Sequence, residues 1–292
     1  MKQYYKHFFF SVVAASLLFC YGCKKQNETK LANVNVKVAD FSITQDEFPD
    51  GKSSDIGDYS GVKAIMLAFY NGDTEAYKHT QIRVDSSTYT TFGSFNCALP
   101  MANYTMVVLG FGYVDGDTLV LTSPTEAVYT SEHPRETFAS TKAVAITNTE
   151  DLAITDTLSR IIAKVNVVST DIKTENASTV RTTFSAGGKD FNPTTGLAIT
   201  NTGFDNTVGA TIPPGVTTIS INYIFLASDE QTMDIEIDVL DTDGNSISHK
   251  EVPNVPLRRN RITTLTGSIY NADAASNFLI DTDWLPGNDV PF

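Results

Sequence analysis

Residues Val62–Tyr70 read VKAIMLAFY and are followed by Asn71-Gly72-Asp73. Successive side chains of a β-strand point to opposite faces, so an apolar run of this length with apolar residues on both faces is typical of a central strand in a β-sandwich. Asparagine and glycine directly after the run favour a tight hairpin turn. The stretch therefore predicts a buried strand that turns back into the same sheet.

The residues around this run predict more strands of the same kind. Val34, Val36 and Val38 alternate with polar residues, the pattern of a half-buried strand. Further short strands are expected at 82–84, 92–99, 104–112, 118–122 and 143–147. No stretch has convincing helical periodicity. Many short strands separated by turn residues are typical of an all-β sandwich.

A second set of strands begins at Leu158–Val168 and repeats this pattern. Its other members are expected at 179–186, 197–200, 217–226, 233–240, 246–252, 262–270 and 278–284. Most are separated by glycine, proline or asparagine turns. The two sets, joined near Asn148–Asp156, predict two tandem β-sandwich domains, one over residues 31–154 and the other over residues 155–292.

The N-terminus has the features of a bacterial lipoprotein signal. Lys2 and Lys6 precede an apolar run at 8–19, which is too short to cross a hydrocarbon core of about 30 Å, and Gly22-Cys23 follows. We expect residues 1–22 to be removed, Cys23 to be acylated and residues 23–30 to act as a tether. Acyl chains on Cys23 would anchor the protein in outer-membrane lipid, exposed at the cell surface. The alternative is an ordinary secretory signal with incidental cysteines.

Composition limits the possible partners. The chain has 292 residues and a net charge of −13, which argues against nucleic-acid binding and against lying flat on an anionic membrane. After signal removal, Cys23 and Cys97 are the remaining cysteines. Because Cys23 is expected to be acylated, Cys97 has no cysteine to pair with, and no internal disulfide is expected. Cys97 lies in an alternating apolar run and is interpreted as an inert core thiol.

The sequence contains no recognisable catalytic or metal-binding motif. His79, His133 and His249 are scattered without metal-ligand spacing. Asp241, Asp243 and Asn245 resemble the start of a calcium loop, but the later positions do not fit, and a hairpin turn is the preferred interpretation. We therefore expect no enzyme activity, no metal, no cofactor and no small-molecule substrate.

Three segments carry a family resemblance: Leu99–Tyr104 (LPMANY), Thr157–Val165 (TLSRIIAKV) and Val255–Gly267 (VPLRRNRITTLTG). Together with the lipoprotein signal, they resemble the fimbrillin superfamily of Bacteroidetes, in particular the FimB-type fimbrial anchor lipoproteins. The resemblance implies two tandem transthyretin-like β-sandwiches. It also implies association with other fimbrial subunits by β-strand complementation, in which a strand of one subunit pairs with an exposed sheet edge of the next.

Two candidate partner sites follow. In the last segment Phe278, Ile280, Thr282 and Trp284 share one face and form a candidate donor strand. The alternative is that this segment is the last strand of the second domain. A second candidate is the cationic patch Arg258, Arg259 and Arg261, which we expect to cluster with Arg160 and Lys164 around two strands. Its alternative is structural pairing with nearby carboxylates.

The leading functional interpretation is a structural fimbrial subunit that anchors the fibre to the outer membrane. Shaft subunits of such fimbriae are cut after an early arginine or lysine, and no arginine precedes Arg83 here, which favours an uncut anchor. Two alternatives remain: a surface glycan-binding lipoprotein of a nutrient-uptake system, and a fimbrial tip adhesin. A single tryptophan, Trp284, argues against a glycan-stacking platform.

Overall fold

A computed structural model of the chain describes residues 30–42, 54–55, 61–83, 91–115, 119–130, 133–210 and 218–282. All regular elements in these ranges are strands, so the predicted all-β class is confirmed for them. No helix within these ranges is long and apolar enough to cross a membrane. Cys23, residues 24–29 of its tether and Trp284 lie outside the described residues.

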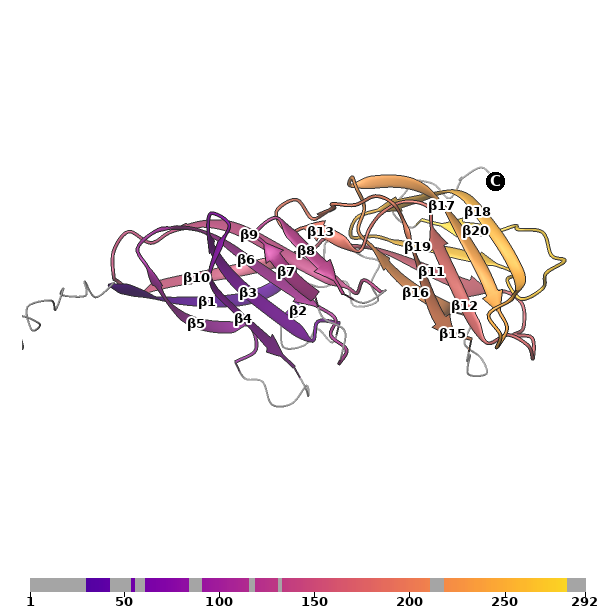
Figure 1. Cartoon of the computed structure of the whole chain (residues 1–292), viewed down its shortest axis with the longest axis horizontal. Coiled ribbons are helices and arrows are strands. Elements are labelled where there is room, and N and C mark those ends of the chain that lie inside the picture. Colours follow the sequence, from indigo (N-terminus) through magenta and orange to yellow (C-terminus); the bar gives the residue numbers. More distant parts are fainter. Residues whose placement is uncertain are drawn as a thin grey trace, which may run out of the picture.

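The first unit is a β-sandwich of two layers (Figure 1). One layer contains β5, β1 and β10, with the short β2 beside the end of β1, and the other follows the order β9-β6-β3-β4. The layers join where β10 pairs with β9 at Ser159–Ala139 and Arg160–Phe138. The strand bounds are β1 Leu31–Ser42, β2 Ser54–Asp55, β3 Ala64–Asn71, β4 Thr74–Ile82, β5 Ser94–Pro100, β6 Asn103–Phe111, β9 Thr137–Ala145 and β10 Leu152–Arg160.

The strand β3 explains why the run Val62–Tyr70 is apolar on both faces. Ile65, Leu67 and Phe69 point into the core between the two layers of the first unit. The intervening Met66 and Tyr70 point the other way, into a second core that the first unit shares with the rest of the chain. A strand that faced only one core would carry polar residues at every second position. The double apolar pattern therefore marks the junction between the two units.

The boundary between the two units lies later than the sequence predicts. The strand β10 runs parallel to β1, from Val34–Leu152 to Ser42–Ser159, and Leu158 is buried in the first core. The predicted strand Leu158–Val168 is therefore two strands, β10 and β11, separated at Ile161-Ile162. The expected boundary at residues 154 and 155 is wrong, because alternating apolar residues do not show which sheet a strand joins.

The second unit is also a two-layered sandwich. One layer has the order β16-β11-β19-β20 and the other β15-β12-β17-β18, and a buried apolar core separates them. The strands β11 and β19 run parallel, as β1 and β10 do in the first unit. The strand bounds are β11 Ala163–Ser169, β12 Thr179–Phe184, β15 Phe204–Gly209, β16 Thr218–Ile224, β17 Glu230–Leu240, β18 Ser246–Arg258, β19 Ile262–Gly267 and β20 Leu279–Asp281.

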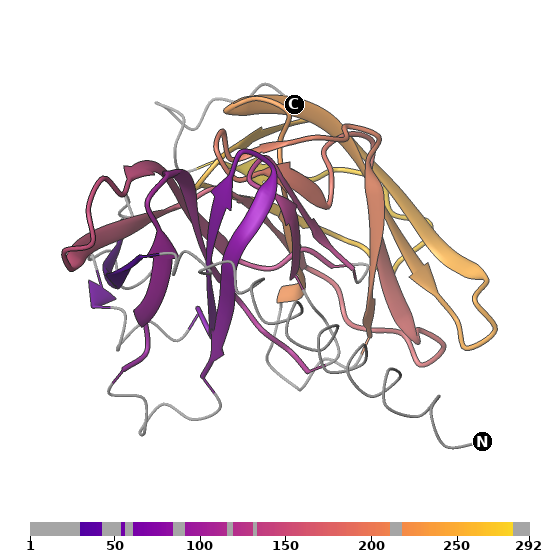
Figure 2. The ribbon, with the colours of Figure 1, turned by 60° about the vertical axis from the view of Figure 1, so that its left-hand side comes forward.

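A separate four-stranded sheet, called the connecting sheet below, joins the two units. It has the order β14-β13-β8-β7, with β7 (Leu119–Ser123) and β8 (Glu126–Tyr129) from the first half and β13 (Asp190–Asn192) and β14 (Leu197–Ala198) from the second. Figure 1 places β7, β8 and β13 between the two units, and Figure 2 shows the units as two groups of strands from a second side.

The shared core packs beneath this connecting sheet. The rings of Phe191 and Phe225 stack with centroids 4.2 Å apart, and Tyr129 stacks on Phe225 at 6.4 Å. Phe191 and Phe225 are both fully buried. Because strands and core residues from both halves of the chain meet here, the two units form one continuous body.

Candidate functional site

The C-terminal segment forms the edge of the second unit's own sheet. β20 pairs antiparallel with β19 through Thr264–Asp281, Leu265–Ile280 and Thr266–Leu279. Phe278 and Thr282 are each 5% exposed, and Ile280 packs against the C-terminal core. The predicted shared face is thus turned inward for its three described members, while Leu279 is exposed. The segment is therefore the last strand of the second unit, which is the alternative to a donor strand that the sequence left open.

The loop before β20 is held by a buried lysine. Lys250 of β18 is 1% exposed, and its ammonium group donates hydrogen bonds to the carbonyl oxygens of Asn271 at 2.8 Å, Ala272 at 3.4 Å and Ala274 at 2.5 Å. Removing an ammonium group from water is unfavourable unless acceptors replace its hydration shell. Three carbonyl groups of one loop supply these acceptors, so Lys250 fixes the loop on the end of the core.

A carboxylate holds the other end of the same loop. Asp171 accepts hydrogen bonds from the backbone nitrogens of Ile269 at 3.0 Å, Tyr270 at 3.0 Å and Asn271 at 2.8 Å, and from the Ser268 hydroxyl at 2.6 Å. Burial acts to raise the pKa of this carboxyl, but hydrogen bonds to its charged form outweigh burial and lower the pKa to about 2. Residues 268–274 are therefore fixed from both sides, and β20 begins shortly after them.

The cationic patch predicted from the sequence is engaged within the chain. Arg258 forms an ion pair with Glu230, with Nε 3.3 Å from Oε1. Arg259 pairs with Asp229 at 2.6 Å and donates to the carbonyl oxygen of Thr195 at 2.7 Å, next to the connecting sheet. This is the structural pairing with nearby carboxylates that the sequence left open as the alternative to a partner-binding patch.

Arg160 does not belong to that patch. Its guanidinium group is buried at the junction, where Nη2 lies 2.7 Å from the Glu136 carboxylate and the group stacks over Phe138 at 5.0 Å. Nη1 donates to Oδ1 of Asn260 at 3.3 Å, and Asn260 holds a left-handed backbone conformation with φ 61° in the turn between β18 and β19. An arginine of the first unit thus contacts the Arg-Asn segment that carries part of the family resemblance.

The remaining residues considered in the sequence, Cys97 and the segment Asp241–Asn245, have structural roles in the fold. Cys97 is buried, and burial raises the pKa of its thiol to about 11, which disfavours the reactive thiolate. The segment Asp241–Asn245 is the predicted hairpin, with β17 and β18 on its two sides. The Asp241 carboxylate accepts hydrogen bonds from the backbone nitrogens of Asp243 and Asn245, both at 2.9 Å. That carboxylate therefore stabilises the turn.

Asp171 and Lys250, which hold the loop before β20, were not identified from the sequence. A signal existed for Lys250, because the alternation of β18 places it between core-facing Ser248 and Val252. For Asp171 the sequence shows only a Ser-Thr-Asp triplet at the end of a strand. Apart from Ser169, whose hydroxyl donates to the carboxylate at 2.7 Å, its partners in the C-terminal loop begin 97 residues later in the chain, at Ser268.

These features define the class of the protein: an all-β chain of two fused sandwich units, with a short strand at the C-terminal edge of the second. Within that class the chain belongs to a family of unknown function, DUF6562, whose model matches residues 26–288. No curated protein sequence matches the chain.

Solved structures share the fold at low sequence identity. A candidate adhesin from Bacteroides ovatus is 10% identical, with 81% of this chain and 89% of that chain covered and a TM-score of 0.51. The fimbrial anchor protein Mfa2 from Porphyromonas gingivalis is 11% identical, with coverage of 81% and 90% and a TM-score of 0.45. The tip fimbrial protein Mfa3 from the same organism is 9% identical, with coverage of 86% and 98% and a TM-score of 0.41. The likeness to the Bacteroides ovatus protein shows the fold.

Proposed function

We propose that this protein is a non-catalytic structural subunit of a cell-surface fimbria, anchored in the outer membrane through acylated Cys23. Its two units correspond to tandem transthyretin-like sandwiches, and it joins other fimbrial subunits by β-strand complementation. The Gly22-Cys23 signal supports the anchor. The fold shared with a candidate adhesin of Bacteroides ovatus supports the surface role.

The observation that carries the proposal is the position of β20. It is a three-residue strand at the edge of a sheet, and its short ladder to β19 covers the C-terminal core with Phe278 and Ile280. An edge strand with so few main-chain hydrogen bonds is the element that another strand can replace, or that can leave to complete a neighbouring sheet. The Lys250 and Asp171 contacts keep the preceding loop in place while β20 exchanges.

The anchor is tested by fatty-acid labelling in cells. The wild type and the control Cys20→Ser take up label and fractionate with the outer membrane, whereas Cys23→Ser does neither. If Cys20→Ser abolishes labelling and Cys23→Ser does not, acylation occurs at the other cysteine.

Strand exchange is tested with a disulfide lock. Thr266 and Leu279 are directly paired between β19 and β20, so cysteines at both positions can link β20 to its own sheet. With β20 as the donor, the reduced variant forms subunit complexes that survive detergent without boiling, and the oxidised variant forms none. Equal complex formation in both states rules out β20. Complexes that dissociate in high salt instead indicate the Arg258, Arg259 and Arg261 patch, because screening weakens exposed ion pairs.

One observation favours the glycan-binding role as a second candidate. A cavity of about 430 Å³ lies between the units, and Tyr113 and Tyr223 line it together with Lys63, Arg135 and Asn206. Aromatic faces and hydrogen-bonding side chains are the groups that hold a sugar ring. Affinity electrophoresis in gels with embedded polysaccharides tests this role. Retardation that Tyr113→Ala removes supports it, and migration equal to that in plain gels excludes it for the polysaccharides tested.

A further inference from the structure

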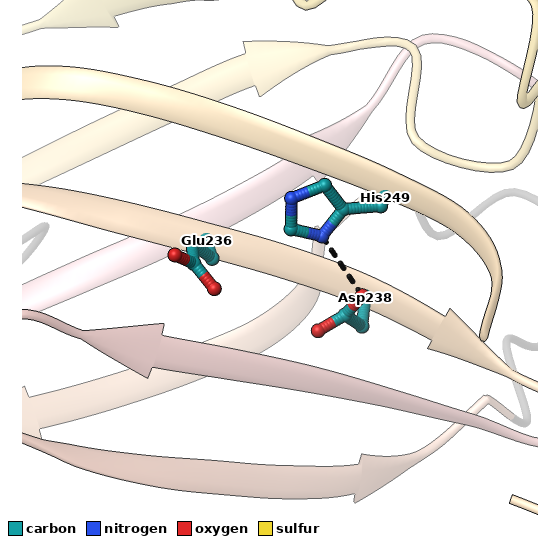
Figure 3. A group of neighbouring side chains, drawn as sticks. All are labelled: Glu236, Asp238 and His249. Atoms are coloured by element: carbon teal, nitrogen blue, oxygen red, sulfur yellow. Dashed lines mark hydrogen bonds and ion pairs between the residues drawn. The ribbon is translucent and has the colours of Figure 1, made fainter. Parts of the chain in front are cut away.

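The outer face of the second unit carries a group of acidic residues around one histidine (Figure 3). Asp238 of β17 lies directly opposite His249 of β18, and Glu236 lies opposite Glu251 in the next outward-facing pair of the same ladder. One ligand atom each from Glu236, Asp238 and His249 lies within 4.8 Å of the other two. The group thus combines an imidazole and three carboxylates on two adjacent strands.

Asp238 determines which nitrogen of the ring carries a proton. His249 Nδ1 lies 2.9 Å from Asp238 Oδ1, and an ionised carboxylate is an acceptor only, so Nδ1 must be the donor. Asp238 is itself 5% exposed and fixed in place, because Arg181 of β12 donates to its Oδ2 at 2.9 Å and Ser246 donates to its Oδ1 at 3.0 Å. In the neutral ring, Nε2 is therefore left with its lone pair.

The lone pair of Nε2 lies on the side of the ring where Glu251 is placed. Nε2 is 3.4 Å from Glu251 Oε1, and Glu236 lies beside the ring on the neighbouring strand (Figure 3). Both glutamates are exposed to solvent on this face of the sheet. A histidine whose other nitrogen donates to a buried carboxylate is the usual arrangement of a metal-ligating histidine.

We propose that Glu236, His249 Nε2 and Glu251 bind a divalent transition-metal ion of the zinc class, with Asp238 as a positioning residue that orients the imidazole. One nitrogen and two carboxylate oxygens form a ligand set that zinc accepts, with water in the fourth position. Arg181 neutralises Asp238, which leaves the net negative charge of the site on the two glutamates that contact the ion. His249 was set aside in the sequence because Glu236 lies on the facing strand, so the three proposed ligands have no motif spacing.

The competing explanation is a pure ion pair, in which His249 is protonated and donates through Nδ1 to Asp238 and through Nε2 to Glu251. The charged groups that face the ring are Asp238 and Glu236 from β17, Glu251 from β18 and Arg181 from β12. A proton and a metal ion compete for the same Nε2 lone pair. Zinc bound at Nε2 therefore excludes a proton from that nitrogen, whereas the ion pair needs no metal.

Isothermal titration of the full chain with zinc chloride at pH 7.5 tests the site by difference. The wild type and the control His79→Ala, which changes an exposed histidine on β4, bind one equivalent more zinc than His249→Ala. Glu236→Gln and Glu251→Gln each weaken that equivalent at least tenfold. Asp238→Asn, which keeps an acceptor for Nδ1, weakens it less than Asp238→Ala.

Unchanged circular dichroism spectra show that each variant is folded. The proposal is overturned if His249→Ala binds as much zinc as the wild type, or if neither glutamate substitution weakens binding.

Discussion

Arg160 and Glu136 form an ion pair of 2.7 Å at the junction of the two units, with side chains only 1% and 8% exposed. Both residues come from the first unit, yet Arg160 also donates to Asn260 of the second. A buried charge is tolerated when its partner and further hydrogen bonds replace the lost hydration. The ion pair therefore places a hydrogen-bond donor for the second unit inside an apolar junction.

Removing one partner leaves the other charge buried. Glu136→Gln should lower the free energy of unfolding by about 3–5 kcal/mol, the usual effect of breaking a buried pair from one side. The matched control is Glu230→Gln, which removes the carboxylate from the exposed Arg258 pair. It should change stability by less than about 1 kcal/mol. Denaturant unfolding measures both, and equal effects would contradict a special role for burial.

Asp171 predicts a loss of stability in acid. The pKa of Asp171 is about 2 in the folded chain, against an ordinary aspartate pKa of 3.8, so the folded state favours the charged form. Such a group contributes stability above its unfolded pKa and loses that contribution as the pH falls through the folded value. After allowing for solvent screening, about 1–2 kcal/mol should be lost between pH 4 and pH 2.

The variant Asp171→Asn isolates this contribution. Its free energy of unfolding should fall less steeply between pH 4 and pH 2 than that of the wild type, while remaining lower at pH 7. Asp234→Asn is a suitable control, because that residue is an exposed aspartate on β17. Identical acid profiles for Asp171→Asn and the wild type would show that the hydrogen bonds around Asp171 do not stabilise its charged form.

The sequence was informative where burial follows a simple alternation. The strands β1 and β5 have buried residues at every second position; the sequence placed β5 close to its observed bounds and located the central part of the longer β1. Most of β4 was not predicted, because this edge strand reads TEAYKHTQI and contains no apolar alternation. Two strands of the connecting sheet, β7 and β14, correspond to the strands expected at 118–122 and 197–200, whereas the short strands β8 and β13 were missed. The sheet as a whole could not be recognised, because β8 and β13 pair across a separation of more than 60 residues.

The candidate sites show the same limit. The inward face of Phe278, Ile280 and Thr282 could be deduced from alternation, because that pattern is local. The partners of Arg160, Lys250 and Asp171 could not, since the described contacts join residues 21 to 100 positions apart. Charge alone placed Arg160 with Arg258, Arg259 and Arg261, whereas packing places it inside the junction.

Lys250 predicts how firmly β20 is held. Replacing it by methionine keeps the length of the side chain but removes the donor from three carbonyl groups. Lys250→Met should lower the free energy of unfolding by about 2 kcal/mol, since unpaired buried acceptors are costly. Amide hydrogen exchange in residues 271–281 should become faster in this variant than in the wild type, relative to exchange in β17. Lys37→Met, which changes an exposed lysine on β1, should alter neither quantity; unchanged exchange in Lys250→Met would mean that other contacts hold the loop.

Phe225 predicts whether the two units unfold together. Its ring lies between Phe191 and Tyr129 in the shared core, so its removal leaves a cavity between the units. A large-to-small change of this kind costs about 3–5 kcal/mol. The wild type should show a single calorimetric transition, because each unit buries apolar surface of the other.

In Phe225→Ala the interface is weakened while each unit keeps its own core, so the single transition should divide into two. The matched control is Phe184→Ala, which removes a ring of the same size from the core of the second unit alone. That variant destabilises the second unit without weakening the shared core. If both variants give the same calorimetric profile, the loss of stability is not specific to the junction. The connecting sheet, rather than the stacked rings, would then couple the two units.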